Sequence, residues 1–210
     1  MRKTALSILA LLAASPASAD MVADWNELLT SVDKAASPPE YMFSTATLQS
    51  GSKTLLAIYE AANAVDRRYA SYVGLPVAAR GSSMDAAVAT AAHDAMLFFY
   101  PGEAKTIEDA YVLALANVPA GPGPDAGIAT GKAAAAAALA AGGLDPKLPQ
   151  AIYKPTAIAG KWAPSSLPYD PHELQVRPWF MASASQLRIG PPPALTSATY
   201  AASVNETQAR

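Results

Sequence analysis

The 210-residue sequence has no cysteine and only 2 histidines. Without cysteine the chain can form neither a disulfide scaffold nor a cysteine-ligated zinc finger. Charged residues make up just 15% of the chain, whereas hydrophobic residues make up 51%, which argues against intrinsic disorder. The length suffices for one domain of medium size with a sizeable core. Much of the apolar content is alanine, which buries little area, so we expect close-packed helices with small residues between them.

After residue 19, clusters of basic residues are also missing, apart from the pair Arg67 and Arg68. Binding to a nucleic-acid backbone needs a basic surface, so nucleic acid is not an expected partner. After residue 19 no apolar run approaches the length that spans a bilayer. We therefore expect no membrane span in the mature chain.

The first 19 residues have the pattern of a secretory signal peptide. Basic residues at 2–3 precede an apolar stretch over 5–14, and Ala17 and Ala19 lie three and one residues before the expected cleavage. The alternative, a buried first helix, would be interrupted by Pro16. The sequence therefore predicts a periplasmic or secreted protein, and the lack of cysteine is compatible with an oxidising compartment.

Hydrophobic periodicity predicts an all-α fold, a bundle of about five helices within residues 20–142. The helices are expected at about residues 24–35, 47–69, 82–100, 106–118 and 125–142. The first is expected to bury Trp25, Leu28, Leu29 and Val32. The second is expected to bury the stripe Leu55, Ile58, Ala62, Val65 and Tyr69.

Local signals mark several helix ends. The patterns Ser82-x-x-Asp85 and Thr106-x-x-Asp109 are typical of capping boxes and predict the starts of the third and fourth helices. Gly142-Gly143 predicts the end of the fifth helix. Gly127 and Gly131, four residues apart in that helix, predict that a neighbouring helix approaches closely.

The chain changes character after residue 142. Prolines are frequent from residue 143 on and helical periodicity is absent until about residue 196. Trp162, Trp179 and Phe180 argue against a disordered linker, so we expect an extended segment that wraps the helical bundle. Thr196 or Ser197 is expected to cap a further helix. The predicted organisation is a signal peptide (1–19), a helical bundle (20–142), a Pro-rich extended segment (143–195) and the start of a truncated helix (196–210).

Several stretches carry a family resemblance. Residues 57–64 follow the pattern Ala, hydrophobic, aromatic, any residue, Ala, any residue, Asn, Ala. The other matching stretches are residues 22–26, 91–101 and 127–134, and within the Pro-rich part 153–155, 160–164, 177–180 and 190–206. Together and in this order they resemble the N-terminal half of secreted bacterial proteins related to vanadium-dependent haloperoxidases and to acid or phosphatidic acid phosphatases (phosphatidic acid phosphatase type 2).

The resemblance implies a helical enzyme that binds phosphate or vanadate and either hydrolyses phosphoesters or oxidises halide with peroxide. Such an oxyanion needs Lys, Arg and backbone amides around it, together with two histidines. In the family these come from Lys…Arg-Pro, Pro-Ser-Gly-His and Ser-Arg…Gly-x-His segments beyond the matched region. Here Ser50-Gly51 is followed by Ser52 and not by His. We therefore assign no catalytic, cofactor-binding or metal-ligating residue, and whether the chain is an enzyme stays open.

Three side chains could still carry chemistry. His93, on a stripe with Met96 and Tyr100, is either a proton carrier or, as we favour, a core or interface histidine. His172, next to Asp170 and Glu173, is a candidate metal ligand, although a solvated turn is the favoured interpretation. Glu60 is a possible general acid for which the sequence offers no partner.

Two functional hypotheses follow. In the first, the chain is the N-terminal helical part of a haloperoxidase- or phosphatase-like protein and is inactive without a catalytic C-terminal half. In the second, it is a stand-alone periplasmic helical module for binding or assembly, without catalytic activity. The expected partners are the catalytic half or further copies of this chain, and a complete family member would hold vanadate or phosphate.

Overall fold

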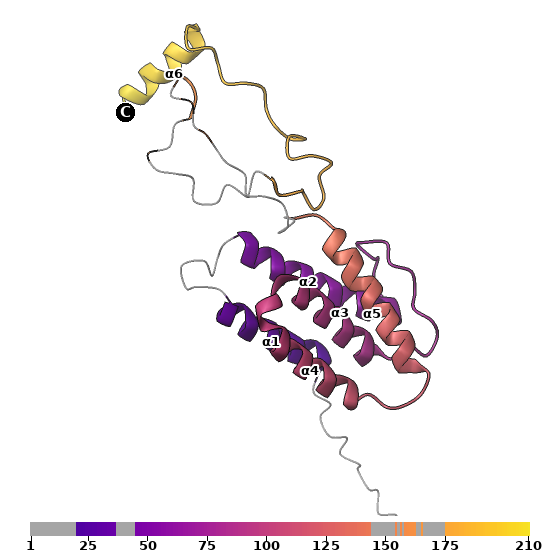
Figure 1. Ribbon diagram of the computed structural model, residues 1–210. Coiled ribbons are helices and arrows are strands. Elements are labelled where there is room, and N and C mark those ends of the chain that lie inside the picture. The colour runs from indigo at the N-terminus through magenta and orange to yellow at the C-terminus, as the bar shows by residue number, and fades with distance from the viewer. Residues whose placement is uncertain are drawn as a thin grey trace, which may run out of the picture.

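The computed structural model describes residues 20–36, 45–143, 154, 156, 158–162, 165 and 175–210. The predicted signal peptide lies outside this range. The helices are α1 (Met21–Ala36), α2 (Thr45–Val65), α3 (Met84–Phe99), α4 (Ala104–Ala116), α5 (Gly123–Ala140) and α6 (Ala198–Gln208), with a 3-10 turn, η2 (Pro101–Glu103), before α4. The predicted all-α bundle is confirmed: α1 to α5 pack together, and α6 lies apart from them (Figure 1). Among the described helices, none combines the length and the apolar character that crossing a membrane requires.

Helix α3 lies at the centre of the bundle, packed against α1, α2, α4 and α5. Most of the side chains that it buries are alanines. Its alanines Ala87, Ala91 and Ala95 pack against alanines of α2 and α5, whereas Val88 and Met96 join a larger apolar cluster. That cluster also contains Trp25, Leu29 and Val32, so the predicted buried face of α1 is confirmed for these three residues.

Two glycines of α5 explain how closely α3 and α5 approach. A Cβ atom added at Gly127 would lie 2.5 Å from the carbonyl oxygen of Ser83, and one added at Gly131 would lie 2.5 Å from that of Ala87. Both neighbours are backbone atoms and cannot rotate away. The predicted close approach at these glycines is therefore confirmed.

The prediction for α2 was wrong in two respects. The helix ends at Val65 and not at Tyr69, and Leu55 and Tyr69 are 43% and 69% exposed. Of the expected stripe only Ile58 is buried, whereas Ala57, Ala61 and Ala64 are fully buried. Burial in this helix follows close contact with the alanines of α3 and α5. Within the expected stripe, Ile58, Ala62 and Val65 do contact the core clusters, whereas Leu55 and Tyr69 do not.

The capping predictions need corrections at two helices. Ser83, not Ser82, caps α3, because its Oγ accepts a hydrogen bond from the amide of Ala86 at 3.2 Å. Ser82 instead donates its hydroxyl to the carbonyl of Ala79. Helix α4 begins at Ala104, so Thr106 lies within its first turn and does not cap it.

At α6 the cap is Ser197, one of the two expected residues. Its Oγ accepts a hydrogen bond from the amide of Tyr200 at 3.1 Å. The helix spans Ala198–Gln208, and the amide of Ala209 still donates to the carbonyl of Asn205 at 3.0 Å.

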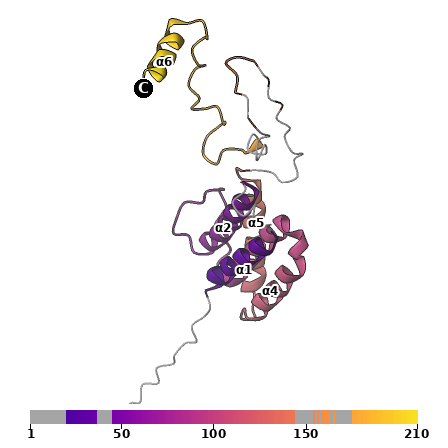
Figure 2. The same cartoon turned by 90° about the vertical axis from the view of Figure 1, so that its left-hand side faces the viewer.

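Residues 175–197, called the arm below, connect the bundle region to α6. The arm is irregular, with bends at 179–183 and a turn at 184–187, and it contacts the bundle through Arg177, Trp179 and Phe180. Every residue from Met181 to Thr196 is exposed. This part of the Pro-rich segment therefore projects from the bundle and does not wrap it (Figures 1 and 2).

Candidate interaction site at the arm

Polar side chains within residues 57–64 of α2 bind the loop that follows this helix. Glu60 is fully buried. Its carboxylate accepts hydrogen bonds from the Ser71 hydroxyl at 2.6 Å and from the amides of Tyr72 and Val73 at 2.6 and 3.2 Å. Sequence reasoning had found no partner for Glu60 because these partners are mainly backbone amides of a loop. Both oxygens of the Glu60 carboxylate accept hydrogen bonds from this loop. This arrangement does not support a role for Glu60 as a general acid.

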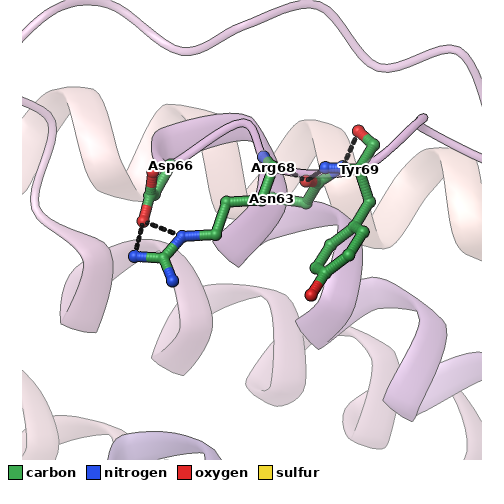
Figure 3. Close-up of polar contacts among 4 residues, drawn as sticks. All are labelled: Asn63, Asp66, Arg68 and Tyr69. Carbon is green, nitrogen blue, oxygen red and sulfur yellow. Dashed lines mark hydrogen bonds and ion pairs between the residues drawn. The ribbon is translucent and has the colours of Figure 1, made fainter.

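Asn63 performs a similar role one turn later in α2. Its Oδ1 accepts from the amides of Arg68 and Tyr69 at 3.2 and 3.0 Å, and its Nδ2 donates to the carbonyl of Tyr69 at 3.0 Å (Figure 3). These bonds replace the helical ones that would continue α2, so the chain turns out of the helix before Tyr69. Arg68 also forms an exposed ion pair with Asp66 beside this turn.

The loop positions Tyr72 against the arm. The Tyr72 hydroxyl donates to the carbonyl of Trp179. Its ring packs edge-on against Phe180 with 5.2 Å between centroids, and the Trp179 ring lies at 6.1 Å. Because Glu60 binds the Tyr72 amide, the buried carboxylate of α2 fixes the loop that contacts the arm.

A second attachment joins the arm to the end of α5. Arg177 and Gly143 exchange two backbone hydrogen bonds, at 2.7 and 3.1 Å. The Arg177 guanidinium donates to the carbonyls of Ala140 and Ala141 at 3.1 and 2.7 Å. These carbonyls belong to the negative end of the helix dipole, where a cation is favourable.

Small residues and a buried lysine complete this attachment. A Cβ atom at Gly142 would lie 2.8 Å from the carbonyl oxygen of Pro178, so the arm backbone requires glycine there. Gly143 has a φ of +93°, and a side chain on it would collide with Gln49. Lys53, 1% exposed, donates its Nζ to the carbonyl of Leu139 at 2.8 Å. The end of α5 thus receives both Lys53 and Arg177.

Beyond these attachments the arm presents large apolar side chains. Phe180, Leu187 and Ile189 are 88%, 77% and 88% exposed. Side chains of this size and exposure are available for contact with another macromolecule. The contacts of Tyr72 and Arg177 hold the start of this segment on the bundle, so the apolar residues are presented from a fixed point.

His93 forms a separate polar cluster between α3 and α4. Its Nδ1 lies 2.8 Å from an Asp94 oxygen and its Nε2 lies 3.3 Å from a Glu108 oxygen. The ring stacks on Tyr111 of α4 with 4.1 Å between centroids. Burial alone lowers the pKa of His93, but the neighbouring carboxylates of Asp94 and Glu108 outweigh it, so the pKa is raised above 6.5. The favoured interpretation, an interface histidine, agrees with this geometry.

The structure separates His93 from Tyr100, which sequence spacing had placed on the same stripe. The Tyr100 hydroxyl lies 2.6 Å from Ser50 Oγ of α2 and donates to Asp33 of α1 at 2.7 Å. Burial raises the pKa of Tyr100 above its ordinary value. Sequence reasoning missed this link between three helices, since no spacing rule connects Asp33, Ser50 and Tyr100.

Metal binding has no further candidate in the part of the chain that the structure describes, where no three His, Asp or Glu side chains are grouped to hold an ion. His172, with Asp170 and Glu173, lies outside the described residues. Among the remaining polar side chains that sequence reasoning singled out, Arg67 donates to the carbonyl of Leu75 at 2.6 Å.

In its described residues the protein is an all-α helical bundle with an attached Pro-rich arm. No protein-family model matches the chain, and neither a curated protein nor a solved structure matches it.

Proposed function

We propose that this chain is the helical N-terminal part of a secreted protein that resembles vanadium-dependent haloperoxidases and acid phosphatases. In this proposal the bundle is a scaffold that presents the arm and α6 to a second body holding the vanadate or phosphate site. The supporting observation is the exposure of Phe180, Leu187 and Ile189 directly after a built attachment to the bundle. These side chains would be buried on the second body, which stabilises such a contact through the hydrophobic effect.

In this proposal the reaction of the second body is taken from the family resemblance. The way in which the arm is attached is taken from the bundle. Glu60 and Asn63, both in the stretch that carries the resemblance, shape the loop that holds the arm. A scaffold role accounts for buried polar residues in this stretch without assigning them to catalysis. We expect the chain alone to hydrolyse no phosphoester and to oxidise no halide.

Activity assays of the purified chain test the proposal directly. We expect no hydrolysis of p-nitrophenyl phosphate, and no bromination of phenol red with vanadate, bromide and hydrogen peroxide. If the purified chain shows turnover above that of a buffer control, and this turnover persists after a second purification, the scaffold role is overturned. Reading the gene past codon 210 in all three frames provides the second test. Arg-Pro, Ser-Gly-His and Gly-x-His segments within a few hundred codons would support the proposal, and their absence would count against it.

A stand-alone binding or assembly module is the second candidate. It is favoured by the two clusters of buried residues that α1 to α5 form with one another. In that case the arms would pair between copies of the chain. Sedimentation analysis distinguishes the two: a dimer that dissociates on Ile189→Ser favours the module, whereas a monomer at all concentrations favours the scaffold.

Secretion is part of both candidates and rests on the N-terminal pattern. Mass spectrometry of the protein recovered from the periplasm or medium should give a mature chain that begins at Asp20. Recovery of the full-length chain in the cytoplasm alone would contradict secretion.

A further inference from the structure

We infer that His93 and Glu108 form a pH-dependent clamp between α3 and α4, closed when the imidazole is protonated. The contact joins two helices, because His93 lies in α3 and Glu108 in α4. Its two atoms, Nε2 and Oε1, lie 3.3 Å apart, and the His93 side chain is only 9% exposed. The Glu108 side chain is 53% exposed, so solvent screens part of this ion-pair contact and its contribution is modest.

The two ring nitrogens make the clamp depend on protonation. A protonated imidazole donates from both nitrogens and can bind both carboxylates. A neutral ring has a single proton, and the shorter contact, 2.8 Å to Asp94, favours its placement on Nδ1. The lone pair of Nε2 then faces the Glu108 carboxylate. Deprotonation thus preserves the contact within α3 and removes the attractive contact between the helices.

Asp94 and Glu108 are the charges that act on His93. The other helices packed against α3 also carry ionisable groups, but none of these shifts the His93 pKa. They are Asp24, Glu27, Asp33 and Lys34 on α1, Lys53, Tyr59 and Glu60 on α2, Lys105, Asp109 and Tyr111 on α4, Asp125 and Lys132 on α5, and Glu103 on η2. The Asp33 carboxylate accepts from Tyr100, and Lys53 and Glu60 bind backbone groups elsewhere.

Loosening α4 would act on the groove that it forms with α1. This groove has a volume of about 280 Å³ and its lining includes Trp25, Leu28 and Leu113. When the clamp opens, α4 remains attached through the buried Ile107 and the stacked Tyr111. We therefore expect local loosening of α4 at high pH and not its complete release.

Amide hydrogen exchange combined with NMR titration of the full chain tests the clamp. His93→Gln assigns the His93 signal, which should titrate above pH 6.5 in the wild type. After correction for intrinsic rates, amides of α4 should be about two- to five-fold more protected at pH 5.5 than at pH 8, as expected for one ion pair. Amides of α5 that exchange by local opening, without global unfolding, serve as the internal control and should show no such change.

Two carboxylate variants separate the clamp from a general pH effect. Glu108→Gln should lower the His93 pKa and remove the pH response of α4, while the fold stays intact because the Glu108 side chain is 53% exposed. Asp94→Asn should also lower the pKa but leave a pH response in α4, since Asp94 lies on the same helix as His93. A response of α4 that is the same in Glu108→Gln as in the wild type, or absent from the wild type, would overturn the inference.

Discussion

The buried carboxylate of Glu60 accepts a hydrogen bond from the backbone amide of Tyr72 at 2.6 Å. Through this bond a side chain in the interior of α2 determines where the Tyr72 ring meets Phe180 of the arm. The same carboxylate also accepts hydrogen bonds from Ser71 and Val73, so it fixes the conformation of residues 71–73.

We predict that Glu60→Ala lowers the free energy of unfolding by about 2 to 4 kcal/mol, because the loop after α2 loses its buried charged acceptor. Urea unfolding measures the loss. Asp66→Ala is the matched control: Asp66 also carries a carboxylate near the end of α2, but its ion pair with Arg68 is exposed. That control should change stability by no more than about 0.5 kcal/mol. If the two variants lose the same free energy of unfolding, the hydrogen bonds of Glu60 stabilise the fold no more than an exposed ion pair does.

Gly131→Ala should destabilise the bundle by about 1 to 3 kcal/mol, since the new methyl group would press on the backbone carbonyl of Ala87. Gly51→Ala, in α2, has open space around its added Cβ and should stabilise the protein by up to about 1 kcal/mol. Thermal unfolding of both variants checks the opposite signs. A stabilising Gly131→Ala would contradict the close approach of α3 and α5.

Tyr72→Ala should release the arm while leaving the bundle folded. The variant loses the hydroxyl bond to Trp179 and the ring contact with Phe180, so residues 177–180 should exchange their amides faster and be cleaved faster by chymotrypsin. Tyr69→Ala is the control, because the Tyr69 side chain is 69% exposed and lies outside these contacts. If the two variants are cleaved at the same rate, Tyr72 does not hold the arm.

The stability of the protein should decrease as His93 loses its proton. The pKa of His93 in the folded chain is raised above 6.5 by Asp94 and Glu108, which outweigh the lowering effect of burial. A raised folded pKa contributes stability that is fully present below pH 6.5 and is lost as the pH rises through the folded value. Melting temperatures of the wild type and His93→Gln should therefore differ more at pH 5.5 than at pH 8.5. A constant difference would show that His93 stabilises the bundle by packing alone.

Sequence periodicity predicted the helices well where large side chains mark one face. Trp25, Leu29 and Val32 are buried as expected, and the glycines at 127 and 131 face α3. Ser197 was among the expected caps of α6. In each case the signal is local: the side chains that define it lie within a few turns of one another.

The errors arise where burial depends on alanine or on distant backbone. In α2, Ala57, Ala61 and Ala64 form the buried face, but alanine gives little contrast between faces, so the larger Leu55 and Tyr69 misled the assignment. Apart from the Ser71 hydroxyl, the partners of Glu60 and Arg177 are backbone groups of loops and helix ends, which have no sequence signature. The arm site could not be predicted for this reason, although its aromatic residues at 179–180 were recognised as anchors.

The attachment of the arm at Arg177 and Phe180 also limits how far α6 can travel from the bundle. Pro191, Pro192 and Pro193 restrict backbone rotation in the intervening segment, so it acts as a semi-rigid spacer and not as a freely coiling chain. A macromolecule that binds α6 is thereby kept at a high local concentration, on the order of millimolar for a short tether, next to the bundle. Even a weak second contact with the bundle surface would then be largely occupied.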